Sequence, residues 1–292
     1  MFVFKAAVVG AGTMGGEIAQ VCAAAGVDVV LKDVEQKFVD QGLKKAEDVT
    51  KGQLAGLVKK EKITEEQAGK QAEEILGRIT GTLDYEGFGD VDFVIEAVPE
   101  RMQIKHAVFA ELDVYTPGHA ILASNTSALS ISEIGEVTTR PDKVVGFHFF
   151  WPASMMRLIE VIEGEDTSEE TVQAAYNFAQ QIRKQPIRCA DAPGFVVNRI
   201  LNSAVSEIWR AQEEDGIDPK EIDKAVAESK AAPMGPFFLA DMVGLDVTLH
   251  VAEHMKESLG DERFYVHQGM KDLVEAGNLG QKTGKGFYEH GN

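Results

Sequence analysis

Two residues in apolar segments of the chain have side chains suited to proton transfer. His148 stands between Phe147 and Phe149, and Glu160 follows twelve residues later in a second apolar segment. An imidazole titrates near neutral pH and can take a proton from a hydroxyl group. A carboxylate on its other nitrogen would fix the tautomer and stabilise the imidazolium. The even separation is compatible with both side chains facing the same way if the two segments form a hairpin of strands.

Two neutral residues have donors suited to an oxygen that gains charge, namely the Ser127 hydroxyl and the Asn198 amide. Each also has a structural explanation, because Ser127 is consistent with the N-cap of a helix and Asn198 with a polar position on one. His148 is likewise compatible with a hydrogen-bonded histidine of the core. Glu160 is harder to explain in that way, because an unpaired buried carboxylate is costly.

A glycine-rich loop near the N-terminus predicts a dinucleotide site. Residues 10–15 fit G-x-G-x-x-G, follow an apolar segment, precede a helical pattern and have Asp33 at the end of the next predicted strand. In this setting the glycines permit the tight turn, the approach of a pyrophosphate and close packing of helix on strand. Asp33 can accept bonds from ribose hydroxyls and would repel a 2′-phosphate, so NAD is favoured over NADP. The predicted cofactor contacts are Gly10, Gly12, Thr13, Met14, Gly15 and Asp33.

Motifs spread over the whole chain resemble those of the L-3-hydroxyacyl-CoA dehydrogenase family. Beyond the glycine loop they lie at residues 124–127, 146–150, 193–199, 233–237, 243–246 and 282–288. The resemblance implies NAD-dependent oxidation of an (S)-3-hydroxyacyl-CoA to a 3-ketoacyl-CoA. It leaves the acyl length and the pathway open, since fatty-acid β-oxidation, butyrate metabolism and the degradation of aromatic compounds all use this step.

The same resemblance implies roles for particular residues. His148 is expected to be the general base and Glu160 its orienting partner, while Ser127 and Asn198 hold the substrate oxygen. The family also implies a homodimer formed through helical domains.

Three further positions match the family less specifically. Glu100 and Lys105 fall near the ribose and nicotinamide half of the cofactor, and are equally compatible with an exposed pair at a helix start. Lys60 falls near the position that contacts coenzyme A in the family. It lies in a basic run that can equally be a solvated helix face of mixed charge.

Two features do not follow the family's pattern. The family often has Asn-Pro after the histidine strand, whereas this chain has Trp151 before Pro152, so the acyl-length preference is open. His250, Glu253 and His254 fit the H-x-x-E-H pattern of zinc peptidases, but no third ligand is evident and we predict no metal site. The residues are also compatible with a dehydrogenase of a free hydroxy acid and with a non-catalytic dinucleotide-binding protein.

The elements expected to position these residues alternate between strands and helices in the first part of the chain. Strands are predicted at 5–9, 27–31, 78–83, 91–97, 120–124, 143–150 and 157–162. We therefore predict an α/β fold, in which residues 1–187 form a doubly wound Rossmann-type NAD-binding domain with a helical insertion near 35–77. Residues 188–292, with a helical pattern over 237–259, are predicted to form a smaller all-helical domain that contributes to the substrate cleft and to dimerisation.

Composition narrows the class of protein. The chain has 292 residues and a formal net charge of −18, which argues against a nucleic acid or an anionic membrane as partner. Cys22 and Cys189 are its only cysteines, which excludes a disulfide framework and favours a reducing cytoplasm. No apolar run approaches the roughly 18 residues of a membrane span. The expected partner is an acyl-CoA thioester.

Overall fold

Eight strands form one sheet in the order β3-β2-β1-β4-β5-β6-β7-β8. Their bounds are β1 (Lys5–Val9), β2 (Asp28–Lys32), β3 (Ile79–Thr82), β4 (Phe93–Glu96), β5 (Ile121–Ser124), β6 (Val144–Phe149), β7 (Leu158–Glu163) and β8 (Gln185–Ala190). Strands β1 to β6 are parallel, β7 runs antiparallel to β6, and β8 runs parallel to β7. The predicted fold class is confirmed, and β8 is an additional strand at the edge of the sheet.

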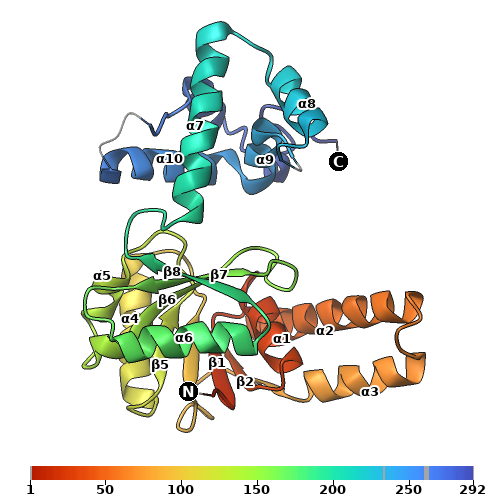
Figure 1. The fold of residues 1–292 in the computed structure, drawn as a ribbon, viewed down its shortest axis with the longest axis vertical. Coiled ribbons are helices and arrows are strands. Elements are labelled where there is room, and N and C mark those ends of the chain that lie inside the picture. The colour runs from red at the N-terminus through yellow and green to blue at the C-terminus, as the bar shows by residue number, and fades with distance from the viewer. Residues whose placement is uncertain (1, 233, 260–262, 292) are drawn as a thin grey trace. The chain divides into compact units, whose positions relative to one another are not determined.

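The structure, a computed structural model, describes residues 2–232, 234–259 and 263–291. The chain forms two units, Met1–Phe195 and Val196–Asn292 (Figure 1). This division differs from the one expected after residue 187, because β8 belongs to the sheet of the first unit. Strand β8 is hard to recognise in the sequence, because it contains Pro186 and only two of its six residues are buried.

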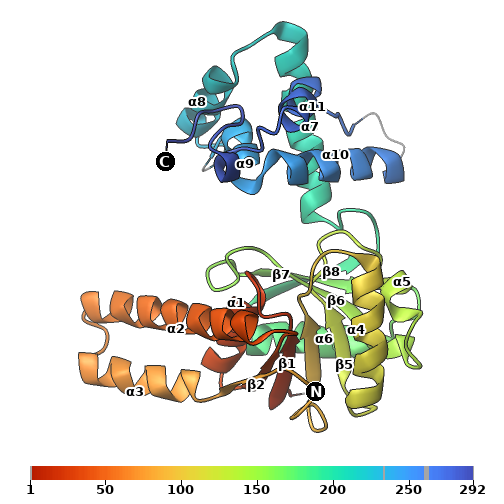
Figure 2. The same cartoon turned by 180° about the vertical axis from the view of Figure 1, so that it is seen from behind.

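Helices cover both faces of the sheet, as Figures 1 and 2 show from opposite sides. Helices α1 (Gly15–Ala24) and α6 (Glu169–Gln181) pack on one face, and α4 (Met102–Tyr115) and α5 (Ile131–Gly135) on the other. On the first of these faces Phe178 of α6 lies 4.6 Å from the ring of Phe93 on β4 and 5.8 Å from that of Phe147 on β6. This aromatic packing holds the strand that carries His148.

The predicted insertion after β2 is confirmed as a pair of helices, α2 (Gln36–Lys59) and α3 (Glu65–Leu76). Thr64 and Gln67 form a capping box at the start of α3. Helix α2 packs so closely on α1 that a Cβ added to Gly16 would lie 2.5 Å from the carbonyl oxygen of Gly42. The pair is therefore anchored through α2, while α3 buries no residue.

The second unit is helical, as predicted. It contains α7 (Val197–Asp215), α8 (Pro219–Ser229), α9 (Pro236–Val243), α10 (Leu245–Leu259) and α11 (Gln268–Glu275). The helical pattern over 237–259 is confirmed as two helices, because Gly244 adopts φ +106° and separates α9 from α10. The core of this unit buries Trp209, Phe237 and Met270. Among the residues described in both units, no helix is long and apolar enough to cross a membrane.

Candidate active site

The glycine loop joins β1 to α1 at the carboxyl end of the sheet. Gly10 has φ +98°, and a Cβ there would lie 2.5 Å from the carbonyl oxygen of Ala97, beyond β4. A Cβ on Gly15 would lie 1.7 Å from the carbonyl oxygen of Gly10. Both glycines are therefore required by the packing of the chain itself. Gly12 differs, because its added Cβ would meet no described atom within 4 Å apart from its chain neighbours.

Asp33 holds this loop in place from the end of β2. Its carboxylate accepts hydrogen bonds from the backbone nitrogens of Ala11, at 2.7 Å, and Val34, also at 2.7 Å. Thr13 is exposed, and Met14 is partly buried as the residue before α1. From β1 the chain adds strands β2 and β3 on one side and β4, β5 and β6 on the other, so a topological switch point lies between β1 and β4. Dinucleotides bind open α/β sheets at such a switch point.

His148 and Glu160 face each other as directly paired residues of antiparallel β6 and β7. His148 Nδ1 lies 2.8 Å from Glu160 Oε2, and the two side chains are 8% and 0% exposed. An ionised carboxylate can only accept a hydrogen bond, so Nδ1 carries the hydrogen and donates it, and Nε2 is the nitrogen that can accept a proton. The ring of Phe150 lies 4.6 Å from the imidazole. The predicted hairpin geometry of this pair is confirmed.

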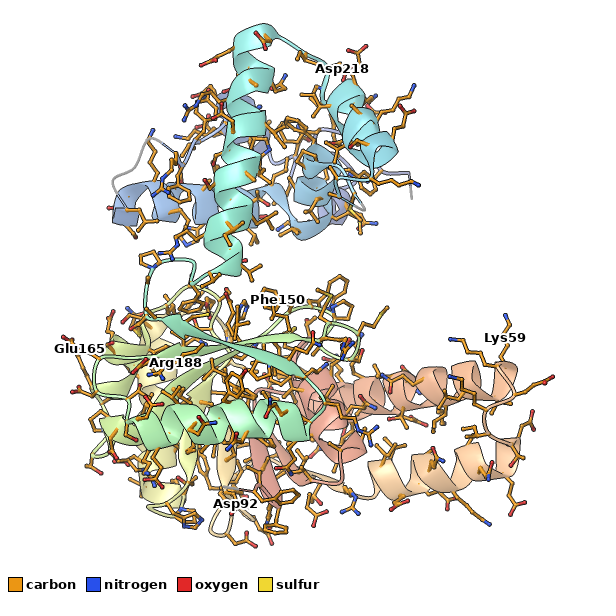
Figure 3. The ribbon with its side chains drawn as sticks, in the orientation of Figure 1. Lys59, Asp92, Phe150, Glu165, Arg188 and Asp218 are labelled. Atoms are coloured by element: carbon orange, nitrogen blue, oxygen red, sulfur yellow. The ribbon has the colours of Figure 1, made fainter. Side chains whose placement is uncertain are left out.

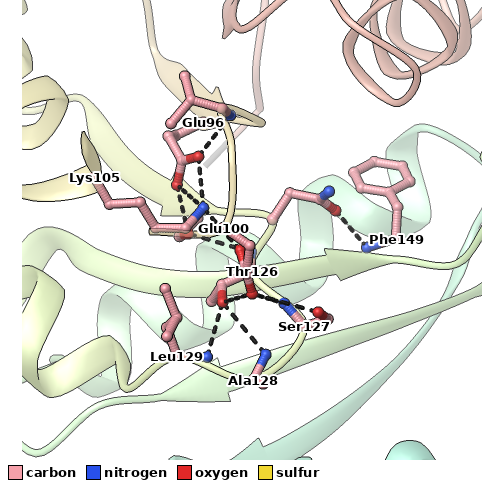
Figure 4. Close-up of polar contacts among 11 residues, drawn as sticks. Glu96, Glu100, Lys105, Thr126, Ser127, Ala128, Leu129 and Phe149 are labelled. Carbon is pink, nitrogen blue, oxygen red and sulfur yellow. Dashed lines mark hydrogen bonds and ion pairs between the residues drawn. The ribbon is translucent and has the colours of Figure 1, made fainter. Parts of the chain in front are cut away.

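A buried ionic cluster lies at the ends of β4 and β5 (Figure 4). Lys105 is 1% exposed, and its Nζ lies 2.7 Å from Glu96 Oε1 and 3.2 Å from Glu100 Oε2. Ser124 donates to the other oxygen of Glu96 at 2.6 Å. Lys105 is thus a buried cation bound by two carboxylates, which rules out an exposed pair of Glu100 and Lys105.

Ser127 belongs to the same cluster. Glu100 Oε1 accepts hydrogen bonds from the Ser127 backbone nitrogen at 2.9 Å, from its hydroxyl at 3.3 Å and from the Thr126 hydroxyl at 2.5 Å. The N-cap of the next helix is Ser130, so the N-cap role considered for Ser127 is wrong. Asn125 accepts from the Phe149 backbone nitrogen at 2.8 Å and ties this turn to the strand of His148.

Four polar residues of this region are absent from the sequence-based site: Glu96, Ser124, Asn125 and Thr126. The signal that could have found them is the run of polar residues at the carboxyl ends of two apolar strands, where ligands of parallel sheets bind. Burial acts to raise the pKa of Glu100. The charge of Lys105 and the hydrogen bonds from Thr126 and Ser127 outweigh it and lower that pKa below its ordinary value.

The remaining predicted residues lie elsewhere. Asn198 is in the first turn of α7, in the second unit, and its carbonyl oxygen accepts from the Asn202 amide at 2.8 Å. Lys60 is exposed and directly follows Lys59, which lies at the tip of the α2–α3 pair (Figure 3). Within the basic run, Lys44 and Lys51 form ion pairs with Glu47, as expected of a solvated helix face.

A zinc site on α10 gains no support from the structure. His250 and Glu253 lie on this helix, whereas the side chain of His254 is outside the described residues. In the described part of the chain, no group of three or more His, Cys, Asp or Glu side chains is placed to hold a metal ion.

Comparison with known proteins decides the family. The sequence family described as "3-hydroxyacyl-CoA dehydrogenase, NAD binding domain" matches residues 5–192, and its C-terminal domain matches residues 194–290. The chain belongs to the 3-hydroxyacyl-CoA dehydrogenase family. It is therefore an NAD-dependent oxidoreductase of that family.

Individual members of the family match over nearly the whole chain. A probable 3-hydroxybutyryl-CoA dehydrogenase of Deinococcus radiodurans is 40% identical over 98% of this chain and 100% of its own. The crystal structure of (S)-3-hydroxybutyryl-CoA dehydrogenase from Ralstonia eutropha is 37% identical, covers 100% of both chains and has a TM-score of 0.91. The chain spans 38% of a fatty acid oxidation complex subunit alpha from a Psychrobacter species, at 42% identity.

The lowered pKa of Glu100 predicts a stability that depends on pH. A carboxylate whose pKa is lowered by folding stabilises the native state above its ordinary value of 4.5 and loses that effect as the pH falls through the lower folded value. We expect Glu100→Gln to lower the free energy of unfolding by about 1 kcal/mol at pH 7, and the difference from the unmodified protein to shrink below pH 4.5.

Urea denaturation across this pH range checks the prediction. Glu73→Gln on the exposed surface of α3 is the control and should change stability little at any pH. A loss in Glu100→Gln that is equal at pH 7 and well below pH 4.5 would contradict the electrostatic explanation.

Proposed function

We propose that this chain interconverts (S)-3-hydroxyacyl-CoA and 3-ketoacyl-CoA, with His148 as the general base and Glu160 as its orienting partner. The observation that carries the proposal is the 2.8 Å hydrogen bond between His148 Nδ1 and the fully buried carboxylate of Glu160. A buried carboxylate hydrogen-bonded to a histidine fixes the tautomer that a proton acceptor needs. The names of full-length relatives support the acyl-CoA substrate.

The chemistry of the histidine follows from this geometry. During oxidation, His148 Nε2 takes the proton of the substrate hydroxyl while Glu160 stabilises the imidazolium that forms. NAD, when bound, supplies the acceptor for the hydride that leaves the carbon bearing this hydroxyl group. In the reverse direction, the imidazolium of His148 returns the proton to the ketone oxygen. The surrounding Phe150 ring excludes water from one side of the imidazole.

The glycine loop fits the pyrophosphate of NAD. Gly12 leaves open the space that a Cβ would fill, and the loop leads into the N-terminus of α1, where backbone nitrogens face an anion. We assign Gly10, Gly12, Thr13, Met14 and Gly15 to this part of the cofactor. Asp33 would accept bonds from the adenosine ribose and also holds the loop through Ala11.

The cluster at the ends of β4 and β5 would serve the other half of the cofactor and the substrate oxygen. Glu100 is 40% exposed, so a ligand can reach it, while the buried Lys105 holds it in place. Glu100 in turn fixes the backbone of Ser127, whose hydroxyl would turn its one hydrogen from Glu100 to the substrate oxygen. We propose that Ser127 and Asn198 donate hydrogen bonds to the substrate oxygen, and that Lys60 contacts the phosphates of coenzyme A.

We further propose that the protein acts as a homodimer in the cytoplasm. Several apolar side chains of the second unit are exposed: Ile200, Leu201, Met242, Val243 and Val247. Exposed apolar groups of this size are typical of protein interfaces. Both cysteines are buried and neither forms a disulfide, as expected for a protein of a reducing compartment.

Replacing the proposed base should remove turnover and leave cofactor binding intact. We expect His148→Ala to lower kcat for the reduction of acetoacetyl-CoA by NADH by about 10²- to 10⁴-fold, because no other group replaces the proton donor. The loss of NADH absorbance measures kcat, and NADH fluorescence measures binding. His119→Ala, at an exposed histidine, is the control. Turnover of His148→Ala close to that of the unmodified protein, or activity on 3-hydroxybutyrate but not on its thioester, would contradict the proposal.

Gly12 tests the cofactor loop without disturbing the chain. Because a Cβ there meets only open space, we expect Gly12→Ala to keep the melting temperature. The same Cβ would occupy the approach of the pyrophosphate, so the Kd for NADH should rise at least about tenfold. Gly52→Ala also adds a Cβ in open space, inside α2, so it should leave the Kd for NADH unchanged and slightly raise the melting temperature. Unchanged NADH affinity in Gly12→Ala would place the pyrophosphate elsewhere.

The oligomeric state has a separate test. Light scattering should give a mass close to twice 31.8 kDa. Val247→Glu, on an exposed apolar position of α10, should shift the protein toward the monomer, whereas Val114→Glu on α4 should not. A monomer at all concentrations of the unmodified protein would refute the dimer.

A further inference from the structure

The loop of residues 151–156, between β6 and β7, presents its large apolar side chains to solvent. Trp151 is 62% exposed, Met155 is 75% exposed and Met156 is 43% exposed. Exposed apolar groups gathered in six residues are unusual on a protein surface unless they contact another molecule or part of one. The same loop has Trp151 where the family pattern often has an asparagine before the proline.

The backbone of this loop is nevertheless fixed by hydrogen bonds from a buried lysine. Lys184, which precedes β8 and is 9% exposed, donates to the carbonyl oxygens of Ala153, at 2.5 Å, and Met156, at 2.7 Å. Within the loop, the backbone nitrogens of Met155 and Met156 both donate to the carbonyl oxygen of Pro152. Burial lowers the pKa of Lys184, so its ammonium is held there against a desolvation cost.

A buried carboxylate fixes the middle of the loop. Glu17 is 2% exposed and accepts hydrogen bonds from the Ser154 backbone nitrogen at 3.1 Å and from the Ser154 hydroxyl at 3.0 Å. Its other oxygen lies 3.2 Å from Lys45 Nζ. Glu17 stands in the first turn of α1, two residues after Gly15. The loop is thus tied directly to the helix that begins at the cofactor loop.

The loop lies close to the proposed base. Trp151 follows His148 by three residues, so their Cα atoms are at most about 11 Å apart even in an extended chain. Between them, the ring of Phe150 contacts the imidazole at 4.6 Å. Figure 3 shows Phe150 at the end of the sheet from which the loop extends. Trp151 therefore lies within about 11 Å, Cα to Cα, of the base at which the C3 oxygen is held, and only the part of an acyl chain beyond C4 can extend toward it.

We propose that Trp151, Met155 and Met156 form an apolar surface that contacts the acyl chain and favours chains longer than four carbons. Glu17 and Lys184 are positioning residues that fix this surface. The proposal rests on the proposed function and adds the substrate preference. Thioether and indole side chains suit the purpose, because they present large apolar areas that adapt to a flexible chain. A fixed backbone means that little conformational freedom is lost on binding.

Chain-length preference tests the surface. The purified protein is assayed with NADH and either acetoacetyl-CoA or 3-ketooctanoyl-CoA, and the ratio of the two kcat/KM values is compared between variants. Each buried methylene contributes a factor of about four. We expect the exposed double variant Trp151→Ala/Met155→Ala to lower the ratio of the longer to the shorter substrate at least about tenfold, with acetoacetyl-CoA changed less than about threefold. A ratio that is unchanged or higher, or an equal loss on both substrates, overturns the proposal.

The anchor has its own test with a conservative variant. Glu17→Ala removes the acceptor for Ser154, whereas the amide oxygen of Glu17→Gln still accepts both hydrogen bonds. We expect Glu17→Ala to raise the KM for 3-ketooctanoyl-CoA at least about fivefold, and Glu17→Gln to restore most of the loss. Glu47→Gln, which breaks an ion pair on the exposed side of α2, is the control. Equal effects of the two Glu17 variants, or none, overturn the positioning role.

These outcomes separate the two proposals. If the unmodified protein does not reduce acetoacetyl-CoA or the longer thioester, the proposed function fails. If it reduces both and the double variant keeps the preference, only the role of the loop fails.

Discussion

The hydrogen bond between His148 and Glu160 is the constraint on which the rest of the first unit depends. It requires β7 to run antiparallel to β6 in a sheet that is otherwise parallel up to that point, with the two residues in direct register. It also requires a carboxylate without solvent exposure, which is tolerable because the imidazole and the Cys189 thiol, 3.9 Å from Glu160 Oε1, provide partners. The core of Phe93, Phe147 and Phe178 holds the strand that carries the histidine.

Three other features lie at the same end of the sheet, where its parallel strands finish. The glycine loop follows β1, the Lys105 cluster joins the ends of β4 and β5, and Asn125 ties the turn after β5 to Phe149. Ser127 is therefore held by a carboxylate that is itself held by a buried lysine. Such chains of charge-assisted hydrogen bonds orient donors before a ligand arrives, which is the arrangement that electrostatic catalysis requires.

Local patterns could be predicted from the sequence, and long-range contacts could not. The glycine spacing, the capping box at Thr64 and the even separation of His148 and Glu160 each follow from geometry within a few residues or one hairpin. The contact of Glu17 with Ser154 joins residues 137 apart, and neither residue signals it alone. Strand β8 escaped prediction because an edge strand with Pro186 lacks a continuous apolar run, and Gly244 divides a pattern that is otherwise helical.

The turnover of Glu160→Gln tests most directly whether this pair performs the chemistry. Glutamine keeps an oxygen that can accept from His148 Nδ1 but loses the charge that stabilises the imidazolium. With acetoacetyl-CoA and NADH we predict a fall in kcat of at least about 100-fold, at unchanged affinity for NADH, because the charge acts only when the histidine is protonated. A kcat within about threefold of the unmodified protein would contradict the role of the pair as base and orienting partner.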